Sequence, residues 1–162
     1  MPHARQQRTD QRQTGVPDGY VGVMDFDERA AAEFLAEPHV AIIAVGSPSG
    51  PPAAVPLWYS YTVGGRIWII TEAASRKRRL LARTGCATLV VDEVVPRTRY
   101  VSVDCELVDA RPATAEDQRQ LASRYVAADT LEAYLATVAA NIPNEQRITL
   151  EPTRWRYADL TP

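Results

Sequence analysis

The residues of this 162-residue chain that are best suited to bind a charged group lie in one segment, WIITEAASRKRRLLAR, at positions 68–83. A strand-like apolar stretch ends at Thr71, and Ser75 is a typical N-cap for the helix that follows. Five of the 18 basic residues fall between positions 76 and 83. A helix N-terminus offers unpaired N–H groups and a partial positive charge, both of which suit phosphate. Basic side chains in the first turn are unfavourable for the helix, and a bound anion would remove that penalty.

Helical geometry separates these cations into two groups. At about 100° per residue, Lys77 falls within about 10° of the middle of the apolar face formed by the leucines at 80–81. Arg76 lies at the border of that face, roughly 90° away, and the arginines at 78–79 lie farther round and should be solvated. We therefore expect Arg76 and Lys77 to bind the anion. Spacing alone also allows a simpler interpretation, a solvated basic helix with a snorkelling lysine.

Length and composition limit the class of protein. With 162 residues, 46% hydrophobic and 23% charged, the chain is typical of one globular domain. A net charge of -2 gives no global attraction to nucleic acid, so we expect no nucleic-acid partner. No stretch has the roughly 20 apolar residues of a membrane helix, and the first residues lack a signal-peptide core. We expect no membrane association and a cytoplasmic location.

Cysteine and histidine usage gives no support for a metal site. Cys86 and Cys105 both lie in strand-like apolar surroundings, where a free thiol usually behaves as a small buried hydrophobe. The two histidines are His3 and His39, and no Cys/His spacing resembles a zinc site. The sequence therefore predicts no metal.

The elements that must position the basic segment can be read from hydrophobic periodicity and turn signals. Residues 1–19 have almost no apolar side chain to bury and are expected to be a disordered tail, with a single domain over 20–162. Helices are predicted over 28–37 (capped by Asp27), 75–85, 115–126 (capped by Thr114 with Asp117) and 130–140. About six strands are predicted, over 39–46, 53–63, 66–73, 86–94, 98–110 and 145–152. Short turns between successive strands favour an antiparallel barrel with peripheral helices, a mainly β fold.

The order AAVPLWYS, RIWIITEAASRKRRLLARTGCATLVV and TRYVSVDCELV resembles the pyridoxamine 5'-phosphate oxidase-like split β-barrel superfamily over roughly residues 28–160. The most specific element is the strand-Thr-x-x-x-Ser-Arg-Lys-helix join. It matches the superfamily's phosphate-binding segment at Thr71, Ser75, Arg76 and Lys77. The resemblance implies a split barrel and an oxidoreductase that uses a flavin or deazaflavin, with the phosphate of the cofactor bound at this join.

The resemblance also implies where the cofactor ring would lie. The strand AAVPLW would run along the ring, and Tyr100 falls where the oxidases place a ring-contacting polar residue. Taken without the family, Pro56 and Trp58 would be an edge-strand proline and a core aromatic residue. No catalytic residue is assigned. The expected cofactor-binding residues are Val55, Pro56, Leu57, Trp58, Ile70, Thr71, Ser75, Arg76, Lys77 and Tyr100.

Differences from the vitamin oxidases favour one branch of the superfamily. Those oxidases carry a basic residue at each end of the strand equivalent to AAVPLW, where this chain has Ala53 and Trp58. The pattern VPLWYS with a short RYVSV strand is more similar to the deazaflavin-using actinobacterial branch. The expected activity is hydride transfer from reduced deazaflavin coenzyme F-420 to a small organic acceptor such as an enone, quinone or tetrapyrrole.

Three alternative functions remain open, and the resemblance also implies an oligomeric state. The cofactor could be flavin mononucleotide (FMN) in an oxidoreductase of the same fold, or the protein could be a flavin-binding protein without turnover. A haem-binding relative would need an axial ligand, for which His39, Cys86 and Cys105 are available. Members of the superfamily are typically homodimers, so a homodimer that acts on a small-molecule substrate is expected.

Overall fold

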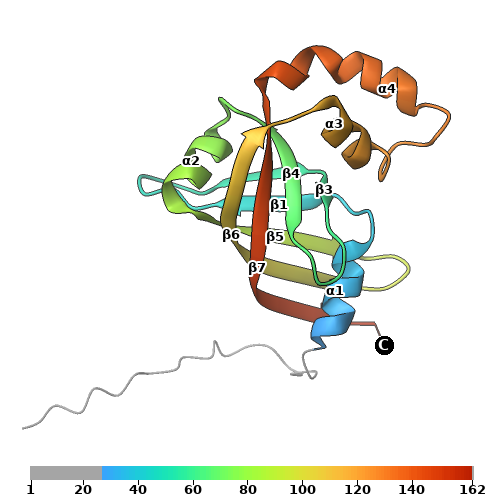
Figure 1. Cartoon of the computed structure of the whole chain (residues 1–162). Coiled ribbons are helices and arrows are strands. Elements are labelled where there is room, and N and C mark those ends of the chain that lie inside the picture. The colour runs from blue at the N-terminus through green and yellow to red at the C-terminus, as the bar shows by residue number, and fades with distance from the viewer. Residues whose placement is uncertain (1–26, 162) are drawn as a thin grey trace, which may run out of the picture.

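The computed structural model describes residues 27–161 and shows one curled antiparallel sheet with helices around it (Figure 1). The predicted tail at 1–19 and the first residues of the predicted domain, 20–26, lie outside the described residues. The sheet has seven strands in the order β2-β1-β5-β6-β7-β4-β3. The strands are β1 (Ala41–Val45), β2 (Ala53–Leu57), β3 (Tyr59–Ser60), β4 (Ile67–Glu72), β5 (Cys86–Glu93), β6 (Arg99–Pro112) and β7 (Glu145–Asp159).

The predicted strand at 53–63 divides in two, which explains why the sheet has seven strands and not six. β2 pairs with β1, with Leu57 opposite Ala41, whereas β3 pairs with β4, with Tyr59 opposite Ile69. The chain therefore changes neighbours within two residues, and β2 and β3 form the two edges of the sheet. The sheet is curved as a barrel requires, but the prediction of a barrel is wrong in closure, because no pairing among the described strands joins the two edges.

The helices begin where the capping residues predicted them. α1 (Glu28–Ala36) is capped by Asp27, whose side chain accepts a hydrogen bond of 3.0 Å from the Ala30 N–H. A capping box of Thr114 and Asp117 starts α3 (Ala115–Ala122). The remaining helices are α2 (Arg76–Thr84), α4 (Leu131–Val138) and the 3-10 helix η1 (Ala139–Asn144). Figure 1 shows α3 and α4 together at one end of the sheet, between β6 and β7 in the chain.

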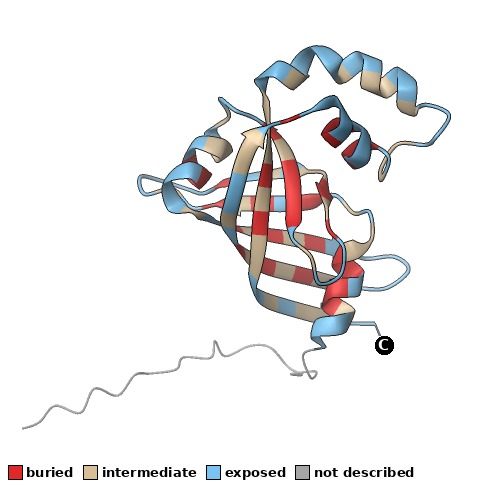
Figure 2. Ribbon diagram, viewed as in Figure 1, coloured by how far each residue is buried: buried red, intermediate tan, exposed pale blue. Residues whose placement is uncertain are grey.

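Alternate residues of the strands fill the inside of the curled sheet (Figure 2). In β1 the residues Ala41, Ile43 and Val45 are buried while Ile42 is exposed, as expected for a strand with one face on the core. α1 adds Phe34 and Leu35, both fully buried, to this core. In the part of the chain that the structure describes, no helix is both long and apolar enough to span a membrane.

Candidate functional site

The turn from β4 into α2 is built by two hydroxyl groups. Ser75 caps α2, and its Oγ accepts a hydrogen bond of 3.3 Å from the Arg78 N–H. The Oγ1 of Thr71, a residue that is 5% exposed at the end of β4, lies 3.3 Å from the same Oγ. Because the first N–H groups of a helix have no partner within the helix, the N–H groups of Arg76 and Lys77 remain available at this end. The turn therefore has the backbone arrangement of an anion site.

The two cations predicted to bind the anion differ in their surroundings. Arg76 is exposed, and its Nη2 donates a hydrogen bond of 2.9 Å to the carbonyl oxygen of Pro51. Lys77 is half-buried, and burial lowers its pKa, an effect that nearby Glu72 partly opposes. None of the described carboxylates forms an ion pair with Lys77. The first turn of α2 holds no acidic residue either, so its positive charge is uncompensated there.

The next two arginines do not share this role. Arg79 is exposed, as expected, and its guanidinium donates to the carbonyl oxygen of Ala74. Arg78 was expected to be solvated but is half-buried, because its Nε donates a hydrogen bond of 2.6 Å to the side chain of Gln146 in β7. Both side chains thus have protein partners outside the first turn.

A cavity of about 290 Å³ separates the start of α2 from β2. Its α2 side is formed by Ser75, Arg76 and Lys77, and its β2 side by residues 52–55. The structure therefore brings the predicted phosphate-binding residues next to the strand predicted to lie along a cofactor ring. The small side chains of Ala53 and Ala54 keep this space open. The proline-rich turn at 51–52, which the sequence marks only as a breaker, also borders the site through the Pro51 carbonyl.

Other residues predicted to bind the cofactor lie outside this cavity. Pro56 is exposed, and Leu57 is half-buried against the core. Trp58 joins β2 to β3, and its ring stacks on Tyr125 with centroids 4.8 Å apart. Ile70 is half-buried in β4, one residue before Thr71.

Tyr100 lies on a strand that does not pair with β2. It is on β6, which β1 and β5 separate from β2. Tyr100 and the Val55 segment therefore do not meet within the sheet of one chain.

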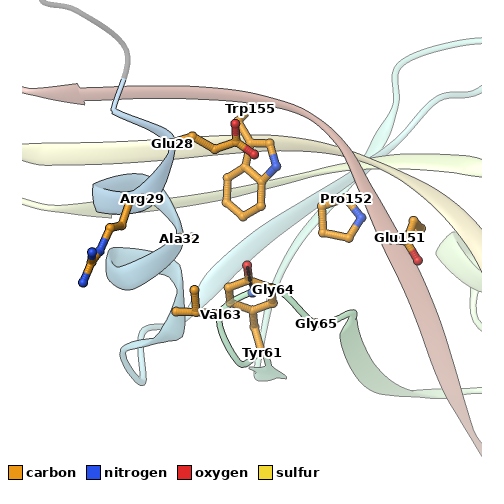
Figure 3. A pocket seen from close by; sticks show the side chains of 10 residues that line it. All are labelled: Glu28, Arg29, Ala32, Tyr61, Val63, Gly64, Gly65, Glu151, Pro152 and Trp155. Atoms are coloured by element: carbon orange, nitrogen blue, oxygen red, sulfur yellow. Dashed lines mark hydrogen bonds between the residues drawn. The ribbon is translucent and has the colours of Figure 1, made fainter.

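A second cavity, of about 480 Å³, lies between α1, the turn after β3 and β7 (Figure 3). Tyr61 and Trp155 form an aromatic pair in it, with ring centroids 5.9 Å apart and tilted by 56°. The arginine that lines it, Arg29 of α1, is paired with Glu33 at 2.8 Å. This cavity is larger but mainly apolar, and it offers no uncompensated cation comparable to Lys77, so we place the anion site at α2. Nothing in the sequence pattern indicates this cavity, because three distant segments form it.

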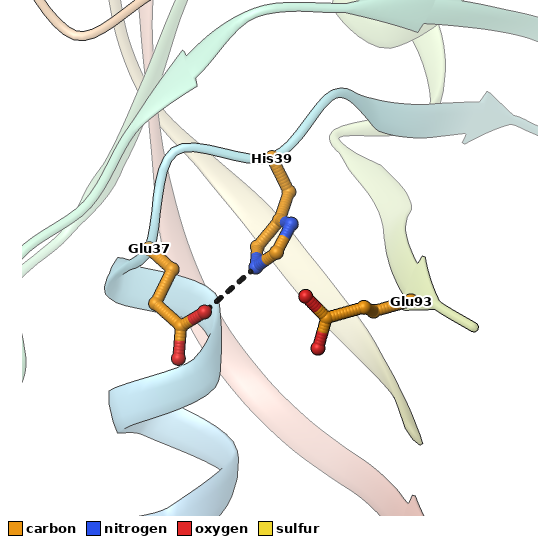
Figure 4. A group of neighbouring side chains, drawn as sticks. All are labelled: Glu37, His39 and Glu93. Atoms are coloured by element: carbon orange, nitrogen blue, oxygen red, sulfur yellow. Dashed lines mark hydrogen bonds and ion pairs between the residues drawn. The ribbon is translucent and has the colours of Figure 1, made fainter. Parts of the chain in front are cut away.

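Glu37, His39 and Glu93 form a cluster whose ligand-type atoms lie within 4.8 Å of one another (Figure 4). The His39 Nε2 is 3.1 Å from a Glu37 carboxylate oxygen. Arg99 contacts both carboxylates, through Nη2 to Glu37 at 2.9 Å and through Nε to Glu93 at 2.7 Å. Because one guanidinium bonds to both carboxylates, the arrangement is that of an ion-pair network that joins the end of α1, β5 and β6.

A family comparison identifies the class of protein. The family model of pyridoxamine 5'-phosphate oxidase matches residues 27–159. The chain therefore belongs to the pyridoxamine 5'-phosphate oxidase family, as the join from Thr71 to Lys77 predicted. No curated protein matches the chain in sequence.

Solved structures share the fold at low sequence identity. An "F420 Reductase" is 19% identical, with 87% of this chain and 98% of that chain covered at a TM-score of 0.62. A conserved hypothetical protein from Mycobacterium tuberculosis is 20% identical, with 83% and 85% covered at a TM-score of 0.62. An FAD-binding protein from Mesorhizobium loti is 12% identical, with 83% and 93% covered at a TM-score of 0.59.

Proposed function

We propose that the protein is an oxidoreductase that binds a phosphate-bearing deazaflavin, coenzyme F-420, and uses it to reduce a small organic acceptor such as an enone, quinone or tetrapyrrole. The observation that carries this proposal is the cavity in which Ser75, Arg76 and Lys77 face β2. Membership of an oxidase family supports the reaction class. The "F420 Reductase" of the same fold supports the choice of cofactor.

The groups at the start of α2 fit a phosphate in charge and geometry. The helix N-terminus, the Lys77 ammonium and the Arg76 guanidinium all favour an anion. Lys77 is half-buried, and none of the described carboxylates forms an ion pair with it. A bound phosphate would compensate the positive charge that burial makes unfavourable. We assign the phosphate to these three donors.

β2 suits the polar edge of a flavin-type ring. It is an edge strand that pairs with β1 on one side, so the other side of its backbone presents N–H and C=O groups to a ligand. Val55, Pro56 and Leu57 would line the ring, and Pro56, which lacks an N–H, fits an edge position. The cofactor would supply the hydride, while the protein binds it, orients it and excludes water.

Two features favour the deazaflavin over FMN. Ala53 is small, uncharged and 6% exposed, so no cation approaches the ring from that position. Arg76 and Arg79 are exposed beside the phosphate site, where the acidic tail of F-420 would extend into solvent. FMN also has a phosphate for Arg76 to bind but lacks that tail, so it would gain nothing from Arg79. The FAD-binding protein with the same fold keeps a flavin as the second candidate.

We further propose that two copies of the chain form the complete site. Tyr100 does not reach β2 within one chain, because β1 and β5 lie between them. The outer face of β1 and β2 is apolar and exposed, with Val40 at 54% and Ile42 at 39% beside exposed Pro56. A second copy packed on this face would cover it and could bring its own Tyr100 to the ring.

Turnover with reduced cofactor tests the proposed function. Reduced F-420 and reduced FMN are each mixed anaerobically with the protein and with a panel of quinones, enones and tetrapyrroles, and cofactor oxidation is followed by absorbance. We expect protein-dependent oxidation of F-420 with at least one acceptor, lost in Lys77→Ala and kept in Arg79→Ala. Oxidation of neither cofactor above the rate in buffer would contradict the proposal.

A further inference from the structure

The junction between β2 and β3 is the place where the sheet could open. β2 and β3 are consecutive in the chain yet occupy opposite edges of the sheet, with Trp58 alone between them. Within residues 27–161 no strand pairing joins β2 to β3, and we call their junction the seam. The three residues before it, 55–57, are those we assign to the cofactor ring. Residues 55–57 pair with residues 41–43 of β1, and the seam fixes the end at which this paired segment leaves β1.

One phenol group bridges the seam. The Tyr125 hydroxyl lies 2.7 Å from the Tyr59 carbonyl oxygen and 3.0 Å from that of His39, and it donates its single proton to these acceptors. The same oxygen accepts a hydrogen bond of 3.1 Å from the Tyr59 N–H. His39 lies two residues before β1, and Tyr59 begins β3, so a side chain outside the sheet connects the segment that leads into β1 with the edge strand β3.

The ring of Tyr125 contacts the seam as well. It lies parallel to the Trp58 indole, with an interplanar angle of 6° and centroids 4.8 Å apart. Tyr134 of α4 packs on the same indole at 5.5 Å. Burial raises the pKa of the Tyr125 hydroxyl, which keeps it protonated as a donor. Both the backbone and the side chain at the junction are thus held from the α3–α4 segment.

A neighbouring tyrosine provides a matched contrast. The Tyr59 hydroxyl is also buried and donates to the carbonyl oxygens of Leu35 at 2.7 Å and Glu37 at 3.1 Å. These acceptors belong to the end of α1 and the residue after it. Loss of the Tyr59 hydroxyl would weaken packing on α1, whereas loss of the Tyr125 hydroxyl would free the seam itself.

We propose that Tyr125 is a positioning residue that clamps the seam and so holds residues 55–57 in the conformation that receives the cofactor ring. This inference rests on the proposed function. If the clamp is removed, only a fraction of the molecules hold residues 55–57 in the conformation that binds the ring. The apparent affinity for the ring is then the original affinity multiplied by that fraction. The phosphate site at α2 is built from other residues and would keep its own contribution.

The test uses Tyr125→Phe, which keeps the stacking ring and removes only the hydroxyl. Binding of FMN and phosphate-free riboflavin, and of F-420 and its phosphate-free riboside, is measured for the wild type, Tyr125→Phe, Tyr59→Phe and Lys77→Ala. We expect Tyr125→Phe to weaken the phosphorylated and phosphate-free members of a pair by the same factor, about tenfold. Lys77→Ala should weaken only the phosphorylated member, and Tyr59→Phe should change neither by more than about twofold despite its lost hydrogen bonds.

Amide exchange separates the clamp from the cofactor. The Tyr59 N–H donates to the Tyr125 hydroxyl, so its protection from hydrogen exchange should fall in Tyr125→Phe and stay near the wild-type value in Tyr134→Phe. Unchanged affinity for every ring in Tyr125→Phe, or a loss equal to that in Tyr59→Phe, would overturn the positioning role. If the wild type binds none of the four ligands, the proposed function fails and the positioning role with it, while reduced protection at Tyr59 would still establish the clamp.

Discussion

The Oγ1 of Thr71 lies 3.3 Å from the Oγ of Ser75, so the last buried side chain of β4 contacts the N-cap of α2 directly. This contact fixes the direction in which α2 leaves the sheet. It places the first turn of the helix beside β2, across a cavity of about 290 Å³. The position of the proposed anion site is therefore set by a strand end and a cap, and Arg76 and Lys77 add their charges to it.

Alanine substitution of the two cations tests whether the site is specific. Arg76→Ala and Lys77→Ala should each weaken cofactor binding by about 1.5 to 3 kcal/mol, the range for hydrogen bonds to a charged group. Arg79→Ala should cost less than about 1 kcal/mol, because this exposed side chain bonds to the Ala74 carbonyl. Equal losses at all three positions in a binding titration would indicate a diffuse basic patch.

The pH dependence of phosphate binding should report on Lys77. Burial lowers the pKa of Lys77, so the ammonium loses its proton at a lower pH than an exposed lysine does. Below that pKa Lys77 is fully protonated and contributes fully to phosphate binding. The affinity for the phosphate group should fall as the pH rises through that pKa. The ratio of FMN to riboflavin affinity, measured from pH 7 upward, isolates this effect from ring ionisation. In Lys77→Arg the ratio should stay constant over the same range, and a constant ratio in the wild type would contradict the role of Lys77.

The start of α3 depends on the buried carboxylate of Asp117, which is 3% exposed. It accepts hydrogen bonds from Arg111 at 2.7 Å and from Arg147 at 2.8 Å, besides those of the Thr114 cap. Arg111 first, then Arg147 and Thr114, hold the Asp117 pKa well below its usual range. A depressed folded-state pKa gives stability that is complete above the unfolded pKa of about 4 and is lost as the pH falls through the folded value.

Asp117→Asn should therefore lower the free energy of unfolding by about 2 kcal/mol at pH 7, because the half-buried guanidinium groups of Arg111 and Arg147 lose their charge partner. Below about pH 4 the difference from the wild type should narrow. Urea unfolding at pH 7 and pH 3 measures both values. Glu132→Gln, which breaks the exposed pair with Arg119, is the control and should leave the free energy of unfolding nearly unchanged at both pH values. A difference that is the same at both pH values would refute this account of Asp117.

Assembly can be tested on the outer face of the sheet. Ile42 is exposed on β1 and lies opposite Pro56 of β2 and Val90 of β5. Ile42→Asp should convert a dimer to a monomer in light scattering without loss of folded structure, because the side chain faces away from the core. Val63→Asp, at a position that is 56% exposed outside this face, should remain dimeric. A monomeric wild type, or a dimeric Ile42→Asp, would exclude this interface.

Local signals in the sequence predicted the helices well. Asp27, Ser75 and the Thr114/Asp117 pair all cap helices where expected, because capping depends on a few adjacent residues. The angular position of Lys77 on α2, close to the apolar face, predicted that its side chain faces the core, and Lys77 is half-buried.

Features that depend on contacts between distant segments could not be predicted in this way. A continuous apolar pattern over 53–63 gives no sign that the strand divides at Trp58, since the division depends on which strands lie on each side. Arg78 is drawn from solvent by Gln146, which is 68 residues away. The bridge from Tyr125 to Tyr59 likewise joins elements that only the fold brings together.

Equilibrium titration of the purified protein with F-420 and with FMN tests the central claim most directly. The account predicts micromolar or tighter binding of F-420, weaker binding of FMN, and a loss of part of the F-420 affinity as salt screens the contacts of its acidic tail. Protein that purifies with stoichiometric FMN and does not bind F-420 would contradict the choice of cofactor. Failure to bind either cofactor would contradict the assignment of the cavity between α2 and β2 as a cofactor site.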